Sequence, residues 1–273
     1  MSSLADAPLG RVTPYPERYD PGLLFRIHRS EQRQALGLTG ELAFSGCDDW
    51  TAYELSWLDA VGKPQVGVAR IRIPADSLAL PESKSLKLYL GSLAHERLGS
   101  AHQVGDLVRR DLAQACSADI VVSILQADHF AELMVQPLEG KCIDDEVIEA
   151  DTFLRQPEFL SCGARFVEET VHSSLFRSTC PITGQPDYGD VVIRYAGAQI
   201  DHASLLRYLV SYRHHGAFHE TCAENIFVDI AQACSPVRLS VHARFTRRGG
   251  IDINPFRSNF EQPPFPLLRT PRQ

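Results

Sequence analysis

Two stretches of this chain carry the same pattern, S-L-x-x-Y-L-x-S, which reads SLKLYLGS at Ser85–Ser92 and SLLRYLVS at Ser204–Ser211. Two further blocks repeat in the same order: Gly99–Gln103 matches Gly216–Glu220, and Asp111–Ser117 matches Asp229–Ser235. The three offsets are 119, 117 and 118 residues. Similar offsets in an unchanged order indicate an internal duplication, so we expect two copies of one structural unit. The alternative is two ordinary amphipathic helices of similar composition.

Each copy has the periodicity of a helix pair set among strands. Apolar residues recur at helical spacing between Val104 and Cys116 and again between Ala223 and Cys234. The run Val237–Phe245 alternates apolar with polar residues, as a strand does. Further strands are predicted at Thr51–Leu58, Gln65–Ile73, Phe166–Arg177 and Asp190–Tyr195. Each half therefore predicts the order strand-strand-helix-helix-strand-strand, an α+β fold with an antiparallel sheet and both helices on one face.

The repeat also predicts the domain boundaries. We expect an N-terminal arm at 1–45, a first module at 46–141, an acidic linker at 142–160, a second module at 161–260 and a tail at 261–273. Both ends are rich in proline, at positions 14, 16, 21, 263, 264 and 266. Such ends are expected to lie on the surface rather than to fold as units.

Composition excludes several classes of protein. The 273 residues are 44% hydrophobic and 22% charged, as in ordinary globular proteins. The net charge of −7 disfavours nucleic acid as a direct partner, and no apolar run is long enough for a membrane helix. No signal peptide is recognisable at the start of the chain. Seven cysteines, an odd number without a C-x-x-C pair, predict reduced thiols in a cytoplasmic protein.

Cys180 is the candidate nucleophile. It follows a strand-like run and precedes a turn marked by Pro181 and Gly184, a type of position that is usually exposed. A thiolate attacks polarised carbon, and Asp187 can return across the turn to act as general acid or base. The alternative is that Cys180 is a small buried side chain.

Histidines near the second copy of the G-x-x-H block, Gly216–His219, allow two interpretations. His219 and Glu220 are predicted in the first turn of a helix, where a carboxylate is favoured, so simple helix capping is one of them. Zinc is the other, because His215, His219 and Cys222 have ligand spacing together with His214. Gly216 interrupts the helix between these histidines and no C-x-x-C partner exists, so we do not expect a metal.

The first copy contributes different polar residues. Glu82 either accepts hydrogen bonds from a heterocycle edge or begins a helix, and Lys84 and Lys87 either contact phosphate or form a solvated face. The basic turn Arg247–Gly250 allows close approach of a ligand to its backbone. No G-x-G-x-x-G follows a strand, so a nicotinamide cofactor would bind without that motif. Neither half holds a complete set of polar groups, so we expect one active site between the halves.

The stretch Glu82–Leu90, ESKSLKLYL, resembles the signature of the NADPH-dependent nitrile reductases. These enzymes convert 7-cyano-7-deazaguanine to 7-aminomethyl-7-deazaguanine in the biosynthesis of queuosine, a modified tRNA nucleoside. The resemblance runs from about Tyr19 to Asn259. Its other parts are Tyr53–Leu58, Cys180–Gly189, Tyr212–His215, Phe218–Glu220 and Thr246–Asn259.

The resemblance implies two tandem tunnelling-fold modules in a homodimer. It implies that Cys180 forms a covalent thioimide with the nitrile and that Asp187 donates a proton. The substrate-binding positions that it implies are Pro81, Glu82, Ser83, Phe218, His219 and Glu220; the NADPH positions are Ser83, Lys84, Arg248 and Gly249. Two NADPH molecules would be used in each turnover, with no metal, no membrane and no direct contact with nucleic acid.

Two rival functions stay open at this point. One is a zinc-dependent cyclohydrolase of the same fold that acts on GTP or a pterin, with Cys180 or Cys222 and the histidines as ligands. The other is a purine-binding module without catalytic activity.

Overall fold

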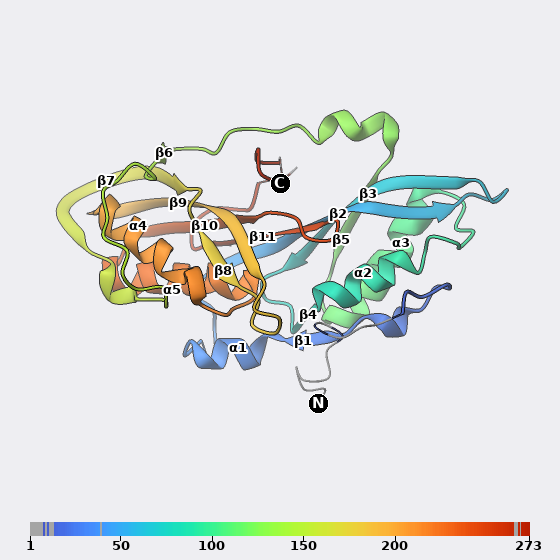
Figure 1. Ribbon diagram of the computed structural model, residues 1–273, viewed down its shortest axis with the longest axis horizontal. Coiled ribbons are helices and arrows are strands. Elements are labelled where there is room, and N and C mark those ends of the chain that lie inside the picture. The colour runs from blue at the N-terminus through green and yellow to red at the C-terminus, as the bar shows by residue number, and fades with distance from the viewer. Residues whose placement is uncertain (1–7, 9, 11–13, 39, 265–266, 268) are drawn as a thin grey trace. The chain divides into compact units, whose positions relative to one another are not determined.

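A computed structural model of the chain describes residues 8, 10, 14–38, 40–264, 267 and 269–273 (Figure 1). The chain folds into two compact units. Unit 1 comprises Met1–Gly40, Asp48–Met134 and Arg247–Asp252; unit 2 comprises Glu41–Cys47, Val135–Thr246 and Ile253–Gln273. Both combine helices with antiparallel strands, so the predicted α+β class is confirmed. No helix among the described residues is long and apolar enough to cross a membrane.

Unit 1 places its helices beside a short sheet. Its strands are β1 (Arg26–His28), β2 (Ser45–Leu58, whose first three residues belong to unit 2), β3 (Pro64–Pro74), β4 (Ala79–Pro81) and β5 (Val121–Leu125). Its helices are η2 (Pro21–Leu23), α1 (Arg29–Ala35), α2 (Ser83–Gly91), α3 (Ala101–Cys116) and η3 (Ala127–Glu132). The strand order is β5-β3-β2, while β1 and β4 form a separate antiparallel pair.

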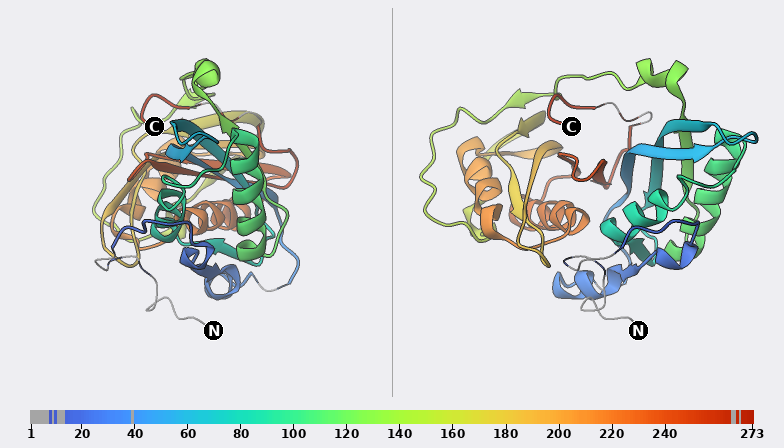
Figure 2. Two further views of the ribbon diagram at one scale, coloured as in Figure 1. Left: turned by 90° about the vertical axis from the view of Figure 1, so that its right-hand side faces the viewer. Right: turned by 45° about the vertical axis from the view of Figure 1, so that its right-hand side comes forward.

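Unit 2 has a larger sheet. Its strands are β6 (Lys141–Cys142), β7 (Cys162–Ser173), β8 (Arg177–Thr179), β9 (Pro186–Ile200), β10 (Arg238–Phe245) and β11 (Ile251–Ser258, whose first two residues belong to unit 1). Its helices are η4 (Pro157–Phe159), α4 (His202–Val210), η5 (Ser211–His214) and α5 (His219–Cys234). The strand order is β11-β10-β9-β7-β6, with β8 paired to the start of β9. The two orange helices α4 and α5 lie together against these strands, and α5 packs on β10 and β9 (Figure 2).

The long helices and most strands lie where the sequence predicts them, and two strand predictions differ. The run predicted as Phe166–Arg177 ends with β7 at Ser173 and resumes as β8. In the described chain, the second strand predicted directly after β5 is absent, because the next segment, Ala127–Glu132, has no β-branched residue and forms η3. The following strand, β6, pairs in parallel with β7 of unit 2.

The helix pairs of the two units carry matching contacts. In unit 1 the Tyr89 hydroxyl donates to Asp111 Oδ2 at 2.7 Å; in unit 2 the Tyr208 hydroxyl donates to Asp229 Oδ2 at 2.5 Å. The second helix of each pair ends at a serine in the left-handed conformation, Ser117 with φ 53° and Ser235 with φ 46°. The repeat in the sequence therefore has a counterpart in repeated side-chain and backbone contacts.

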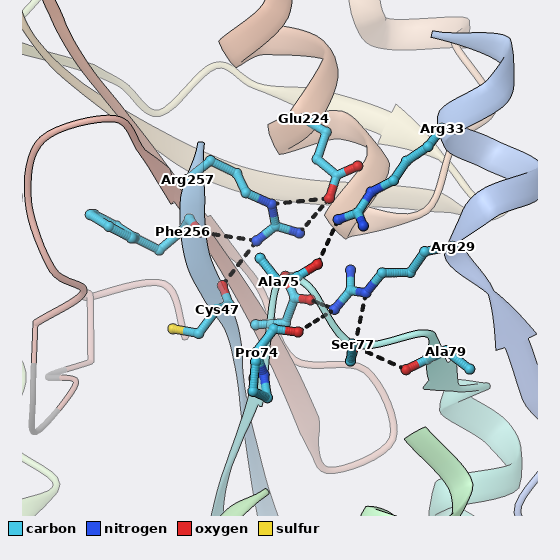
Figure 3. A network of polar contacts seen from close by, with 11 residues as sticks. Arg29, Arg33, Cys47, Pro74, Ala75, Ser77, Ala79, Glu224, Phe256 and Arg257 are labelled. Atoms are coloured by element: carbon cyan, nitrogen blue, oxygen red, sulfur yellow. Dashed lines mark hydrogen bonds and ion pairs between the residues drawn. The ribbon is translucent and has the colours of Figure 1, made fainter. Parts of the chain in front are cut away.

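The N-terminal segment is folded, contrary to the prediction of a surface arm. Its strand β1 pairs with β4, and Arg29 and Arg33 of α1 are buried. Figure 3 shows the reason: Arg29 Nε donates to Ser77 Oγ at 3.0 Å, and Arg33 Nη2 donates to the Ala75 carbonyl at 2.6 Å. Buried guanidinium groups are tolerated when their donors are satisfied in this way.

The end of the chain is also anchored in unit 2. Gln273 is buried and its side-chain amide donates to the Phe245 carbonyl at 3.1 Å, while Arg244 Nη2 donates to Gln273 Oε1 at 2.8 Å. The predicted surface position of the tail is therefore wrong for this residue. Pro266, which was part of that prediction, lies outside the described residues.

The polar face of β10 borders a cavity of about 250 Å³ in unit 2. Its lining includes Arg194, Arg244 and Glu261. The charges there are largely balanced, since Arg194 forms ion pairs with Glu139 and Glu261 at 2.6 and 3.0 Å. Ser240, His242 and Arg244 of the alternating run line this cavity and are buried, whereas Arg238 is exposed.

Candidate active site

The β8–β9 hairpin of unit 2 holds the candidate nucleophile. Ser178 lies opposite Asp187 in the ladder, and the Cys180 amide donates to the Gln185 carbonyl at 2.8 Å. The turn between β8 and β9 includes Gly184, whose φ of +68° favours glycine. Paired residues lie side by side, so Ser178 and Asp187 project from one face of the hairpin, and Cys180 directly follows the end of β8, two residues after Ser178.

The segment that leads into α5 joins this hairpin. The Thr179 amide donates to the His215 carbonyl at 3.0 Å, and the Ala217 amide donates to the Thr179 carbonyl at 3.1 Å. These bonds bring the first turn of α5 to the hairpin, beside Asp187. His219 Nε2 lies 3.6 Å from Asp187 Oδ1, and the Phe245 ring meets the His219 ring edge to face, with centroids 4.0 Å apart.

Cys180 is only 4% exposed, so the prediction of an exposed position is wrong. The turn residues suggested exposure, but the backbone that precedes α5 covers β8. Asp187 and Glu220 are buried as well. Burial raises the pKa of the Cys222 thiol to about 12, and the nearby Asp187 and Glu220 carboxylates reinforce this rise. The hairpin and α5 therefore bring two carboxyl groups and a second thiol into one desolvated region.

The other α5 candidates occupy its first turn. Phe218 is the N-cap residue and is half-buried, and it makes no side-chain capping bond. Glu220 lies in the first turn, where the helix dipole favours a carboxylate.

The two histidines before α5 have different surroundings from His219. His214 ends η5 and its ring packs on Phe153 at 5.5 Å. His215 Nε2 lies 3.4 Å from the Asn225 amide nitrogen, and burial lowers the pKa of His215. Across the part of the chain that the structure describes, no group of three or more histidine, cysteine, aspartate or glutamate side chains is arranged to hold a metal ion.

In unit 1, Glu82 is fully buried at the start of α2, directly after Pro81 at the end of β4. Its carboxylate accepts the Lys84 amide at 2.6 Å and the Ser85 amide at 2.9 Å, so it caps the helix. The Ser83 hydroxyl lies 3.4 Å from the same carboxylate. Burial raises the pKa of Glu82, against the lowering effect of these hydrogen bonds. The helix-start interpretation is therefore confirmed, and it leaves acceptor capacity on both oxygens.

The basic turn of unit 1 is a tight two-glycine loop. The Arg248 amide donates to the Ile251 carbonyl at 2.9 Å, and Gly249 and Gly250 have φ of 55° and 76°. A Cβ at position 249 would stand 2.9 Å from Lys87 Nζ. The turn thus combines exposed backbone with cationic side chains, a donor set that suits a phosphate group.

Comparisons with known proteins identify the family. A profile described as "Nitrile reductase, 7-cyano-7-deazaguanine-reductase N-term" matches residues 15–124, and one described as "QueF-like protein" matches residues 186–264. The chain is 50% identical over 271 residues to a protein of Burkholderia orbicola (strain MC0-3) named NADPH-dependent 7-cyano-7-deazaguanine reductase, with 98% of both chains covered. The chain belongs to the 7-cyano-7-deazaguanine reductase family.

Other members of the reductase family show the same extent of similarity. Proteins of the same name from Burkholderia cenocepacia (strain HI2424) and Burkholderia ambifaria (strain ATCC BAA-244) are each 50% identical, again over 98% of both chains. A solved structure entitled archaeosine synthase QueF-Like in the apo form matches 37% of this chain and 99% of its own, with 20% identity and a TM-score of 0.32. The family assignment rests on the full-length relatives.

Two residues of the hairpin region were not predicted as site residues from the sequence. Ser178 pairs with Asp187 in the ladder, and Phe245 packs against the ring of His219. Ser178 has one usable signal, its position two residues before Cys180 on a strand. Phe245 belongs to the alternating run Val237–Phe245, which predicts a buried side chain but not its contact with His219, because that contact depends on how β10 aligns with α5.

Proposed function

We propose that this chain is an NADPH-dependent 7-cyano-7-deazaguanine reductase that works through a covalent thioimide on Cys180, in the biosynthesis of queuosine. The reductase activity is supported by 50% identity to reductases over nearly their full length. The mechanism is supported by one arrangement in particular: Asp187 pairs with Ser178, two residues before Cys180, in the β8–β9 hairpin, and His219 lies 3.6 Å from the Asp187 carboxyl group.

In the proposed reaction, Cys180 Sγ adds to the nitrile carbon. The S–H proton of Cys180 passes to the Asp187 carboxylate, a C–S bond forms, one C–N π bond breaks, and the nitrogen takes that proton from Asp187. The buried setting of Cys180 excludes water, which would otherwise hydrolyse the thioimide. A positioned general acid contributes about 10²–10⁴-fold to such a step.

NADPH supplies the hydrides, two in each turnover, when it is bound. Ser83, Lys84, Arg248 and Gly249 are the residues that we propose to hold it. The unit 1 turn fits such a group because it combines backbone at positive φ with the nearby Lys87 ammonium. No step in the proposal requires a metal ion.

We propose that buried carboxylates hold the deazaguanine base. Glu82, with Pro81 and Ser83, and Glu220, with Phe218 and His219, are the candidate contacts. Both carboxylates are almost fully buried, and a buried acceptor discriminates strongly against bases that lack the matching N–H donor.

We further propose that the chain consists of two tunnelling-fold modules, at 46–141 and 161–260, and acts as a cytoplasmic homodimer without direct contact with nucleic acid. The arm, linker and tail keep the boundaries 1–45, 142–160 and 261–273. The matching tyrosine–aspartate contacts of α2–α3 and α4–α5 support a tandem repeat.

The deciding experiment is intact-protein mass spectrometry after addition of 7-cyano-7-deazaguanine without NADPH. We expect the wild type to gain the mass of the whole substrate and Cys180→Ala to gain none. Cys142→Ala, which changes an exposed cysteine of β6, is the matched control and should keep the adduct. Asp187→Asn should retain the adduct better than it retains turnover. A wild type without an adduct would refute the covalent mechanism, and stoichiometric zinc that is essential for activity would favour the cyclohydrolase.

A further inference from the structure

One buried hydroxyl beside the proposed chemistry makes no hydrogen bond. Ser178 of β8 is 0% exposed, and its Oγ has no hydrogen-bond partner among the described residues. Two other buried serines of unit 2 are satisfied: Ser173 Oγ accepts the Leu175 amide at 3.1 Å, and Ser240 Oγ donates to Glu261 Oε1 at 2.6 Å. A buried hydroxyl without a partner lowers stability, because folding removes its hydrogen bonds to water and does not replace them.

This hydroxyl lies on the face of the β8–β9 hairpin that meets α5. Ser178 pairs with Asp187 in the ladder, and such paired side chains project from one face with their Cβ atoms about 5 Å apart. His219 Nε2, in the first turn of α5, lies 3.6 Å from Asp187 Oδ1. Cys222 follows His219 by three residues, so the two share one face of the helix, and the Cys222 thiol is the polar group that acts with Ser178.

Neither of these neighbours satisfies the Ser178 hydroxyl. Burial raises the pKa of Cys222 to about 12, so this group is a neutral thiol at neutral pH, and its sulfur is a weak acceptor. The Asp187 carboxyl group is directly across the ladder, yet it accepts no hydrogen bond from Ser178. The hydroxyl therefore keeps its donor and acceptor capacity beside the carboxyl group that is proposed to protonate the substrate.

We propose that the Ser178 hydroxyl binds the reacting nitrogen of the substrate, beside Asp187. This inference rests on the proposed function, which brings that nitrogen to the Asp187 carboxyl group. A hydroxyl suits every state of the nitrogen, because it donates to the lone pair of a nitrile and can rotate to accept an N–H bond of an amine. The serine gives up no proton, so the proton balance of the reaction is unchanged. This second contact keeps the half-reduced group oriented between the two hydride transfers.

Ser178→Ala distinguishes this role from a structural one. The variant removes a hydroxyl that has no partner in the resting chain, so it should resist urea at least as well as the wild type. Ser173→Ala is the matched control: it removes a buried hydroxyl that accepts the Leu175 amide, so it should lower stability and leave ligand binding unchanged. A Ser178→Ala protein that is less stable than Ser173→Ala would show a structural hydroxyl and overturn the proposal.

Calorimetric titration with two deazapurines measures the proposed contact. 7-Aminomethyl-7-deazaguanine carries the nitrogen, whereas 7-deazaguanine has the same ring system without it. Ser178→Ala should bind the aminomethyl compound about tenfold more weakly than the wild type does and should bind 7-deazaguanine within about twofold of the wild type. Equal losses for the two compounds, or no loss for either, would contradict a contact with the nitrogen.

The rate of adduct formation separates this inference from the proposed function. If the wild type forms no adduct with 7-cyano-7-deazaguanine, both are refuted. If it forms the adduct, Ser178→Ala should form the same adduct about tenfold more slowly, because the nitrile nitrogen has lost a hydrogen-bond donor. A variant with the wild-type rate and the wild-type affinity for the aminomethyl compound would refute the role of Ser178 and leave the proposed function intact.

Discussion

The helix pairs α2–α3 and α4–α5 share a scaffold and differ in their first turns. In unit 1 the buried carboxylate is Glu82 at the start of α2, and in unit 2 it is Glu220 at the start of α5. Their counterparts are exposed caps: Asp201 accepts the Ser204 amide at 2.8 Å, and Gln103 belongs to the capping box of α3. The helix pair is kept while the buried carboxylate changes position, which is the pattern expected when duplicated units divide one binding task.

The buried aspartates of the two pairs are braced by different segments. Asp111 of unit 1 accepts from Tyr19, which belongs to the N-terminal segment. Asp229 of unit 2 accepts a hydrogen bond from Arg155 Nε at 2.7 Å, and this arginine belongs to the predicted linker. In each unit, a segment that precedes the helix pair thus hydrogen-bonds to its buried aspartate. The arm and the linker therefore contribute to the stability of the units.

The largest expected effect comes from making the two first turns alike. Glu220→Gln removes a buried carboxylate that is proposed to bind the base, so kcat/KM for 7-cyano-7-deazaguanine should fall by about 10²-fold. Gln103→Glu, the reciprocal change at an exposed cap, should alter kcat/KM by less than about twofold. Steady-state kinetics of both variants measure the difference. Equal effects would mean that the position of the buried carboxylate has no functional meaning.

A smaller effect is expected from removal of the shared tyrosine hydroxyls. Tyr208→Phe should destabilise unit 2 by about 2 kcal/mol and Tyr89→Phe should destabilise unit 1 by about 1 kcal/mol. Tyr208 loses more because its hydroxyl also contacts the Tyr212 hydroxyl at 2.8 Å. Urea unfolding monitored by circular dichroism gives both values. A Tyr89→Phe variant that is the less stable of the two would contradict this ranking.

The smallest effect concerns pH and Glu82. Burial raises the pKa of this carboxyl above its ordinary value of 4.5, so the folded chain holds the proton more tightly than the unfolded chain does. The stability that this proton provides is complete below pH 4.5 and is lost as the pH rises through the raised pKa. Glu82→Gln does not titrate at this position. The unfolding free energy of the variant should therefore rise relative to that of the wild type as the pH rises from 4 to 7.

Urea unfolding at several pH values measures this trend. Asp201→Asn changes the exposed cap at the corresponding position of the second copy and is the matched control. A constant difference between Glu82→Gln and the wild type across this range would show that burial does not penalise the charged carboxylate.

The helices were predictable because their signal is local. The 3.6-residue periodicity of α3 and α5 and the repeated blocks determine both helix pairs without knowledge of what packs against them. The pairing of β1 with β4 was not predictable, since it depends on residues about 50 positions apart. The same holds for the burial of Arg29, whose charge alone favours a surface position.

In the candidate site, too, local features could be predicted from the sequence and long-range contacts could not. The chemistry of Cys180 and Asp187 could be read from residue types and from a turn between them. The burial of Cys180 could not, because the covering backbone at Ala217 joins the hairpin from a distant part of the chain. The placement of His219 beside Asp187 depends on the same contact between the segment before α5 and the hairpin.

The buried tyrosines allow opening of each helix pair to be followed by ultraviolet absorbance. Burial and the neighbouring aspartates raise the pKa values of Tyr89 in unit 1 and Tyr208 in unit 2 far above the ordinary value of 10. These rings stay phenols in alkaline solution that converts a solvated tyrosine to tyrosinate, with its red-shifted absorbance. Each unit thus carries an intrinsic chromophore. Its ultraviolet absorbance shifts to that of tyrosinate only when the helix pair opens and exposes the ring to alkaline solvent.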